Sequence, residues 1–145
     1  MLSAMDVANY FLSIASEDDG ELISNMKLQK LLYYAQGFAL ALRGDSLFGD
    51  RIEAWTHGPV VPSVYHAFKH SQGGPVVPEE DIDWDAYSPD DRVLLDEVYQ
   101  VYGQYSASAL RALTHSEPPW CDTPEGAEIT CSAMKEFFET QILDG

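Results

Sequence analysis

The stretch SNMKLQKLLYYAQGFALALRG, residues 24–44, carries the clearest structural signal in the chain of 145 residues. Its apolar residues recur at steps of three and four, a pattern that gives one side of an α-helix a continuous apolar stripe. Ser24 or Asn25 is suited to cap the start of this helix, and Gly44 to end it. Large residues off the stripe predict that neighbouring elements cover the helix on more than one side. The stripe comprises Leu28, Leu31, Leu32, Ala35, Phe38, Ala39 and Leu42, and off it lie Tyr33, Tyr34 and Leu40.

Five other segments show helical spacing after a residue that favours a helix start. The sequence therefore predicts a mainly α fold, a compact helical bundle of about six helices forming one domain over residues 1–145. The start residues are Ser3, Pro62, Ser88 with Pro89, Ser106 and Thr130. The expected apolar faces are Val7, Tyr10, Phe11 and Ile14; Val64, Tyr65 and Phe68; Leu94, Leu95, Val98, Tyr102 and Tyr105; Leu110 and Leu113; and Met134, Phe137, Phe138 and Ile142.

Residues 46–61 read differently from the helices. Short apolar pieces bounded by Gly, Asp and Pro predict a small β-hairpin or short strands there, before the helix that Pro62 starts. The pentapeptide GPVVP occurs at 58–62 and again at 74–78. Only the first copy is expected to shape a turn and a helix start, because the second lies in a predicted surface loop, residues 71–88, which Trp84 and Tyr87 would anchor.

The chain is strongly acidic, with 24 Asp and Glu against 8 Lys and Arg and a formal net charge of -16. Such a charge disfavours binding to nucleic acid and to anionic membranes. The longest apolar run, residues 38–42, is too short to span a bilayer. Solubility explains the charge, and an acidic surface that attracts a basic partner is the second interpretation.

Cys121 and Cys131 are the two cysteines of the chain. This number does not make a disulfide framework, and we expect reduced thiols in the cytoplasm, both packed as small apolar groups. His66 and His70 are spaced as i and i+4, which metal sites use, but Ala67 stands where a glutamate base would be needed and no third ligand follows. A metal- or thiol-dependent hydrolase using His66, His70 or Cys121, with His115 or His57 as base, is the alternative hypothesis. The sequence predicts no catalytic residue, no metal and no cofactor.

Three stretches of the sequence resemble one known family. They are MKLQKLLYYAQG at 26–37, LFGDRIEAWTHGPVVP at 47–62 and VYHAFK at 64–69, with a weaker match from Leu95 to Leu113 and in HSEPPW at 115–120. In this order they resemble the Panacea antitoxin domain, the family of SocA and of phage-associated GepA-like proteins.

The resemblance implies a non-enzymatic antitoxin that binds and neutralises a toxin encoded next to it. For proteins of the SocA type, the resemblance also implies that the domain acts as an adaptor, which delivers the toxin to the ClpXP protease. The motif residues are then structural or contact the toxin: Lys27, Leu28, Lys30, Leu31, Tyr33, Trp55, His57, Gly58, Pro59, Val60 and Tyr65. Among them we expect core packing for Trp55 and Tyr65, and hydrogen bonds or toxin contact for Lys27, Lys30 and His57, as for the neighbouring Glu53.

Overall fold

The computed structural model describes residues 1–18, 23–71, 74–78 and 81–142. These residues form seven α-helices and a small sheet, so the predicted mainly α fold with short strands is confirmed. No helix within these ranges is long and apolar enough to cross a membrane. The helices are α1 (Ala4–Asp18), α2 (Asn25–Arg43), α3 (Pro62–Phe68), α4 (Pro89–Tyr102), α5 (Ala107–His115), α6 (Pro118–Cys121) and α7 (Cys131–Ile142).

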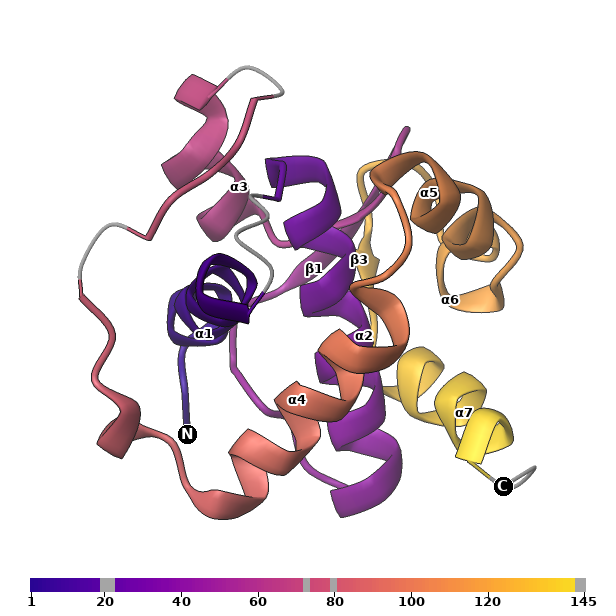
Figure 1. Ribbon diagram of the computed structural model, residues 1–145. Coiled ribbons are helices and arrows are strands. Elements are labelled where there is room, and N and C mark those ends of the chain that lie inside the picture. Colours follow the sequence, from indigo (N-terminus) through magenta and orange to yellow (C-terminus); the bar gives the residue numbers. More distant parts are fainter. Residues whose placement is uncertain (19–22, 72–73, 79–80, 143–145) are drawn as a thin grey trace.

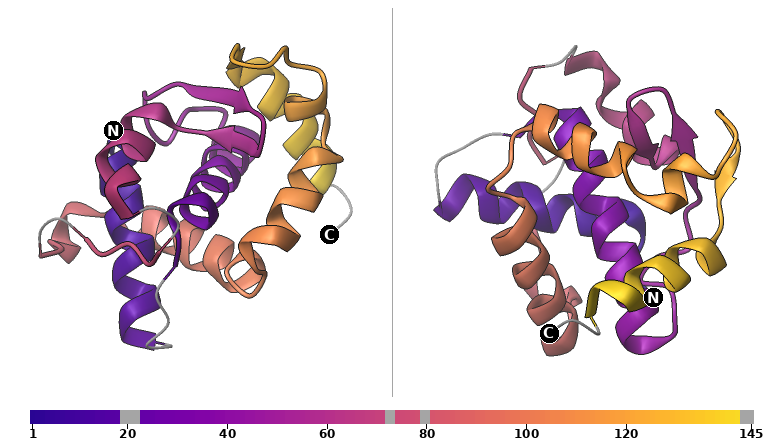
Figure 2. Two further views of the ribbon diagram at one scale, coloured as in Figure 1. Left: turned by 90° about the horizontal axis from the view of Figure 1, so that it is seen from above. Right: turned by 90° about the vertical axis from the view of Figure 1, so that its right-hand side faces the viewer.

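Helix α2 runs through the centre of the molecule, and the other helices are arranged around it (Figure 1). Helix α1 lies on one side, α7 on the other, and α4 crosses in front. Figure 2 shows α5 near the N-terminal end of α2, whereas α4 and α7 lie along its C-terminal half. Residues on every side of α2 are therefore buried, including Tyr33 and Tyr34, as the large residues off the stripe predict.

The ends of α2 are those that the sequence predicts. The Ser24 hydroxyl accepts a hydrogen bond of 3.2 Å from the backbone N–H of Lys27, which satisfies a donor at the helix start. Gly44 ends the helix in the left-handed conformation, with φ of 78°. One stripe residue differs from the prediction: Leu42 is 55% exposed, because none of the described elements covers the last turn of α2 on that side.

The other predicted helix starts are also found. Ser3 and Asp6 form a reciprocal capping box, and the hydroxyls of Ser88, Ser106 and Thr130 accept backbone N–H groups at the starts of α4, α5 and α7. Helix α4 ends earlier than predicted, since Tyr105 lies beyond it and is exposed. Helix α5 ends at His115, and the two prolines that follow begin the short helix α6.

The sheet has three antiparallel strands in the order β2-β1-β3. Strands β1 (Ile52–Trp55) and β2 (Gly58–Val60) form the predicted hairpin, with Trp55 opposite Gly58 at its closed end. Strand β3 (Glu128–Ile129), which pairs with β1, was not predicted, because two residues are too few to show an alternating pattern.

The predicted loop 71–88 returns to the core, with residues 72–73 and 79–80 outside the described ranges. Val76 is buried and its N–H donates to the carbonyl of Ile23, while Val77 is exposed. Tyr87 is buried and Trp84, in the 3-10 turn Trp84–Ala86, is partly buried, so both act as the expected anchors.

Candidate protein-interaction site

The hairpin, the start of α3 and helix α6 bring a group of rings to one surface. Trp55 and Tyr65 are half-buried and meet edge to face, with ring centroids 5.0 Å apart. The exposed His66 lies 6.0 Å from the Trp55 ring, and the indole N–H of Trp120 donates to the carbonyl of Trp55 at 2.8 Å. Together with the exposed His57, we call these five residues the hairpin surface. Trp55 and Tyr65 thus pack on each other at the surface rather than in the core, which corrects the prediction.

A hollow of about 300 Å³ adjoins the hairpin surface between β1 and the end of α6. Trp55 and Trp120 line it, and the Thr56 hydroxyl donates to Glu125 at its edge. On the other side of Trp120, the imidazole of His115 stacks on the indole, with ring centroids 4.0 Å apart and planes within 9°. These contacts fix the rings, so little side-chain freedom remains to be lost on binding.

Gly58 allows strand β2 of the hairpin to pack closely against α2 and α5. Its φ of 128° is a conformation that side chains rarely adopt, and an added Cβ would lie 3.1 Å from the Thr114 hydroxyl and 3.3 Å from Cε of Lys30. Pro59 and Val60 follow as buried residues of β2. The motif residues Gly58, Pro59 and Val60 are therefore buried and are not part of the hairpin surface.

The two motif lysines of α2 have different surroundings. Lys27 Nζ donates to the carbonyl of Gly103, at the C-terminal end of α4, at 2.5 Å, where the helix dipole also stabilises a cation. Lys30 is 1% exposed and its Nζ reaches the carbonyl of Met26 at 3.3 Å. Burial, reinforced by the nearby Arg111, lowers the pKa of Lys30 to about 8.

A buried carboxyl group joins α2 to α6. Tyr33 and Tyr34 donate from their hydroxyls to the two carboxylate oxygens of Glu117, at 2.9 Å and 3.0 Å. Burial raises the pKa of Glu117 to about 7, although both hydrogen bonds act in the opposite direction. Burial and Glu117 raise the pKa of both tyrosines. Glu117 is not predictable as a site from a local motif, and its one signal in the sequence is its position immediately before two prolines.

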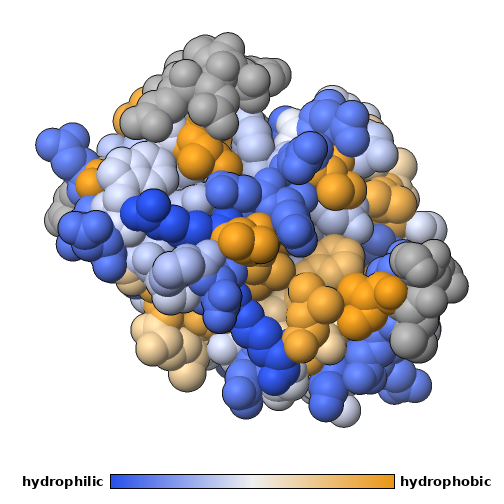
Figure 3. Space-filling model, turned by 60° about the horizontal axis from the view of Figure 1, so that its bottom comes forward, coloured by the Kyte–Doolittle hydropathy of each residue, from blue (hydrophilic) through white to orange (hydrophobic). Residues whose placement is uncertain are grey.

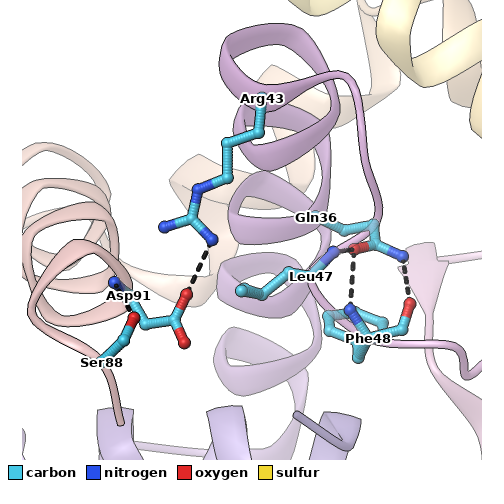
Figure 4. A network of polar contacts seen from close by, with 6 residues as sticks. All are labelled: Gln36, Arg43, Leu47, Phe48, Ser88 and Asp91. Carbon is cyan, nitrogen blue, oxygen red and sulfur yellow. Dashed lines mark hydrogen bonds and ion pairs between the residues drawn. The ribbon is translucent and has the colours of Figure 1, made fainter. Parts of the chain in front are cut away.

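Two glutamines of α2, which the sequence analysis also missed, fix the loops around the hairpin. Gln36 accepts from the backbone N–H groups of Leu47 and Phe48, and donates to the Phe48 carbonyl at 2.8 Å (Figure 4). Gln29 accepts from the N–H of Val61, which directly follows β2, at 2.9 Å. The signal in the sequence for these two glutamines is a polar residue on a helix that is expected to be covered on more than one side, since buried polar groups need hydrogen-bond partners. Leu28 and Leu31, the remaining motif residues, are fully buried in the core.

The residues of the hydrolase hypothesis make contacts of other kinds. His66 contacts the Trp55 and Tyr65 rings, and His70 is exposed beyond the end of α3. Both cysteines are exposed, which corrects the expected packing, and the Cys121 thiol donates to the backbone carbonyl of His115. Across the ranges that the structure describes, no group of three or more His, Cys, Asp and Glu side chains is placed to hold a metal ion.

Comparison with known proteins agrees with the resemblance seen in the motifs. The family model described as Antitoxin SocA-like, Panacea domain, matches residues 28–121, which contain most of α2, the hairpin, α4 and α6. The chain is 36% identical over 137 residues to Antitoxin SocA of Caulobacter vibrioides, covering 82% of this chain and 69% of that protein. No solved structure matches. The chain belongs to the SocA-like Panacea domain family, and this membership supports an antitoxin role.

Proposed function

We propose that this protein is a cytoplasmic antitoxin that neutralises a toxin, encoded by an adjacent gene, by binding it directly and without catalysis. The observation that carries the binding site is the hairpin surface, where the half-buried Trp55 and Tyr65 rings are held 5.0 Å apart beside the exposed His66. Trp and Tyr are enriched among residues that dominate binding energy, and fixed rings lose little entropy on binding. The motif residues below the hairpin support this surface.

The charge of the chain favours a partner with a basic face. The formal net charge of -16 would attract such a protein and repel nucleic acid. The region that the family model matches begins within α2 and ends in α6, but α1 and α7 bury Phe11 and Phe138 in the same core. We therefore infer that residues 1–145 act as one domain in this function.

Co-expression with the product of the adjacent gene tests the proposal. We expect a stable complex on size-exclusion chromatography and restored growth of cells that express the toxin. The double variant His57→Ala/His66→Ala, at exposed positions of the hairpin surface, should weaken the complex by about tenfold or more. The matched control His70→Ala should bind as the wild type does. Absence of both complex and rescue would contradict the antitoxin proposal, and equal binding by both variants would remove the hairpin surface from it.

Neutralisation can proceed by occlusion of the toxin or by its delivery to ClpXP, and the two modes differ in the fate of the toxin. We propose occlusion as the mode that a rigid surface supports. The half-life of the toxin in cells with and without ClpX decides between the modes. Occlusion leaves the half-life unchanged by ClpX, whereas delivery shortens it only when both ClpX and this protein are present.

A further inference from the structure

An apolar groove lies at the end of α2 remote from the hairpin. Its floor and walls come from the C-terminal half of α2, from α4 and from the last turn of α7, and its volume is about 300 Å³. Figure 3 shows hydrophobic side chains gathered on this face and bordered by hydrophilic ones. We call it the helix groove and define it by Phe38, Leu42, Leu94, Val101, Tyr102 and Ile142.

Two residues of the helix groove expose much apolar surface. Leu42 is 55% exposed and Val101 is 48% exposed, and they face one cavity from two different helices. Single exposed apolar residues are common, but a contiguous apolar hollow is typical of an interaction site. Leu42 also continues the core stripe of α2, so a covering element would complete the buried face of this helix.

The lining of the helix groove fits a helix better than a small molecule. Small-molecule sites combine apolar walls with several polar groups that converge on the ligand. Among the described residues, the polar side chains in the lining, besides Tyr102, are those of Glu97 and Gln141, on opposite walls of the groove. An open apolar channel between helices is the arrangement that receives the apolar face of an amphipathic helix.

The charges around the helix groove indicate a basic partner. In the part of the lining that the structure describes, the charged residue is the exposed Glu97. The nearby cation Arg43 is engaged by Asp91, with 2.7 Å between Nη1 and Oδ1 (Figure 4). A second copy of this chain would bring Glu97 against an equally acidic face, at a formal net charge of -16 for each copy. Opposite charges across an interface favour association and like charges oppose it.

We propose that the helix groove binds an amphipathic helix of another protein, with apolar residues toward Leu42 and Val101 and Lys or Arg beside Glu97. This interaction goes beyond toxin neutralisation at the hairpin surface, since the two surfaces involve opposite ends of α2. It does not depend on the antitoxin role.

A synthetic helical peptide tests the groove without any toxin. The probe has about 18 residues, with Leu at i, i+3, i+4 and i+7 and Lys at the remaining positions, and the comparison peptide has Glu in place of Lys. We expect fluorescence anisotropy at low salt to show binding of the Lys peptide at least about tenfold tighter than that of the Glu peptide. Equal binding of the two peptides would overturn the charge argument.

Substitutions locate the binding. Val101→Glu should weaken binding of the Lys peptide by about tenfold or more, while Val77→Glu, at a valine that is 60% exposed outside the groove, should leave it unchanged. Glu97→Lys should reduce the preference for the Lys peptide without reversing it, because the formal net charge of the variant is still strongly negative. Circular dichroism and the Tm verify that each variant is folded, as expected at exposed positions. If Val101→Glu and Val77→Glu bind the Lys peptide equally well, the groove is not the binding site. If the wild type sediments as a dimer and Val101→Glu as a monomer, the groove binds a second copy of this chain instead.

Discussion

The Tyr33 hydroxyl donates a hydrogen bond of 2.9 Å to Glu117, a residue 84 positions further along the chain. This bond and its counterpart from Tyr34 hold the start of α6 against the central helix, and α6 in turn carries Trp120 of the hairpin surface. We therefore expect Tyr33→Phe to lower the free energy of unfolding by about 1–3 kcal/mol, because a buried carboxylate loses a donor. Urea denaturation measures the change. Tyr105→Phe, at an exposed tyrosine, is the control, and equal losses in the two variants would contradict the role of the bond.

The same carboxyl group predicts a pH dependence of stability. The pKa of Glu117 is raised from 4.5 in a free side chain to about 7 in the folded protein. Between these values the folded state retains a proton that the unfolded state has lost, so stability falls as pH rises from 4.5 to 7 and then levels off. Relative to Glu117→Gln, which does not titrate, the wild type should lose roughly 3 kcal/mol across this window. Denaturation of both proteins at several pH values measures it, and a constant difference between them would refute the assignment.

Gly58 is predicted to be sensitive for two separable reasons. Alanine there would be strained at φ of 128° and crowded against Thr114, and we expect Gly58→Ala to cost about 1–3 kcal/mol. Gly44→Ala is the control for strain alone, because φ is 78° but nothing lies within 4 Å of an added Cβ. Gly74→Ala, in the second GPVVP copy, lacks the positive φ, but an added Cβ would lie 3.1 Å from the Ser71 carbonyl oxygen, so it tests crowding alone and should cost less than Gly58→Ala. Thermal unfolding ranks the three, and a loss at Gly74 equal to that at Gly58 would contradict the unequal roles of the two copies.

The comparison of sequence with structure shows which physical signals are local. The helix starts at Ser3, Ser24 and Ser88 were predictable because a capping hydroxyl acts on N–H groups a few residues away. The partners of Glu117 and Gln36 were not, because these bonds join elements whose contact depends on the whole fold. Of the hairpin surface, Trp55 and Tyr65 were among the predicted motif residues and Trp120 was not, and the motif did not separate the buried residues from the exposed ones.

Leu42 shows the same limit of local sequence signals, here for a residue that was expected to be buried and is exposed. Its spacing places it on the buried stripe of α2, but periodicity only states which face of the helix a residue occupies. Whether another element covers that face is decided by where α4 and α7 end, and both leave this turn of α2 open. The helix groove lies where Leu42, a residue of the apolar stripe of α2, is exposed.

Gln36 is predicted to be essential to the segment that leads into the hairpin. Its side chain satisfies the N–H groups of Leu47 and Phe48 and the Phe48 carbonyl, all three of them buried (Figure 4). Gln36→Leu keeps a similar volume but leaves these groups without their partner, so we expect a loss of about 3 kcal/mol or more in urea denaturation. Gln104→Leu, at an exposed glutamine, is the control and should change stability by less than about 0.5 kcal/mol. Similar midpoints for both variants would show that Gln36 does not organise the loop.

Lys30 is predicted to reduce stability at neutral pH, in contrast to Gln36. Its amino group is buried and its pKa is lowered from 10.5 to about 8, so the charged form is costly in the folded state. Lys30→Met keeps the aliphatic stem and removes the charge, and we expect the variant to be at least as stable as the wild type at pH 7. Because the folded protein releases this proton at lower pH than the unfolded chain, wild-type stability relative to Lys30→Met should rise by roughly 3 kcal/mol between pH 8 and 10.5. Chemical denaturation at pH 7 and near pH 10 measures this, with Lys69→Met as the exposed control. Strong destabilisation of Lys30→Met at pH 7 would mean that the ammonium group stabilises the hairpin instead. A difference from the wild type that does not change with pH would refute the lowered pKa.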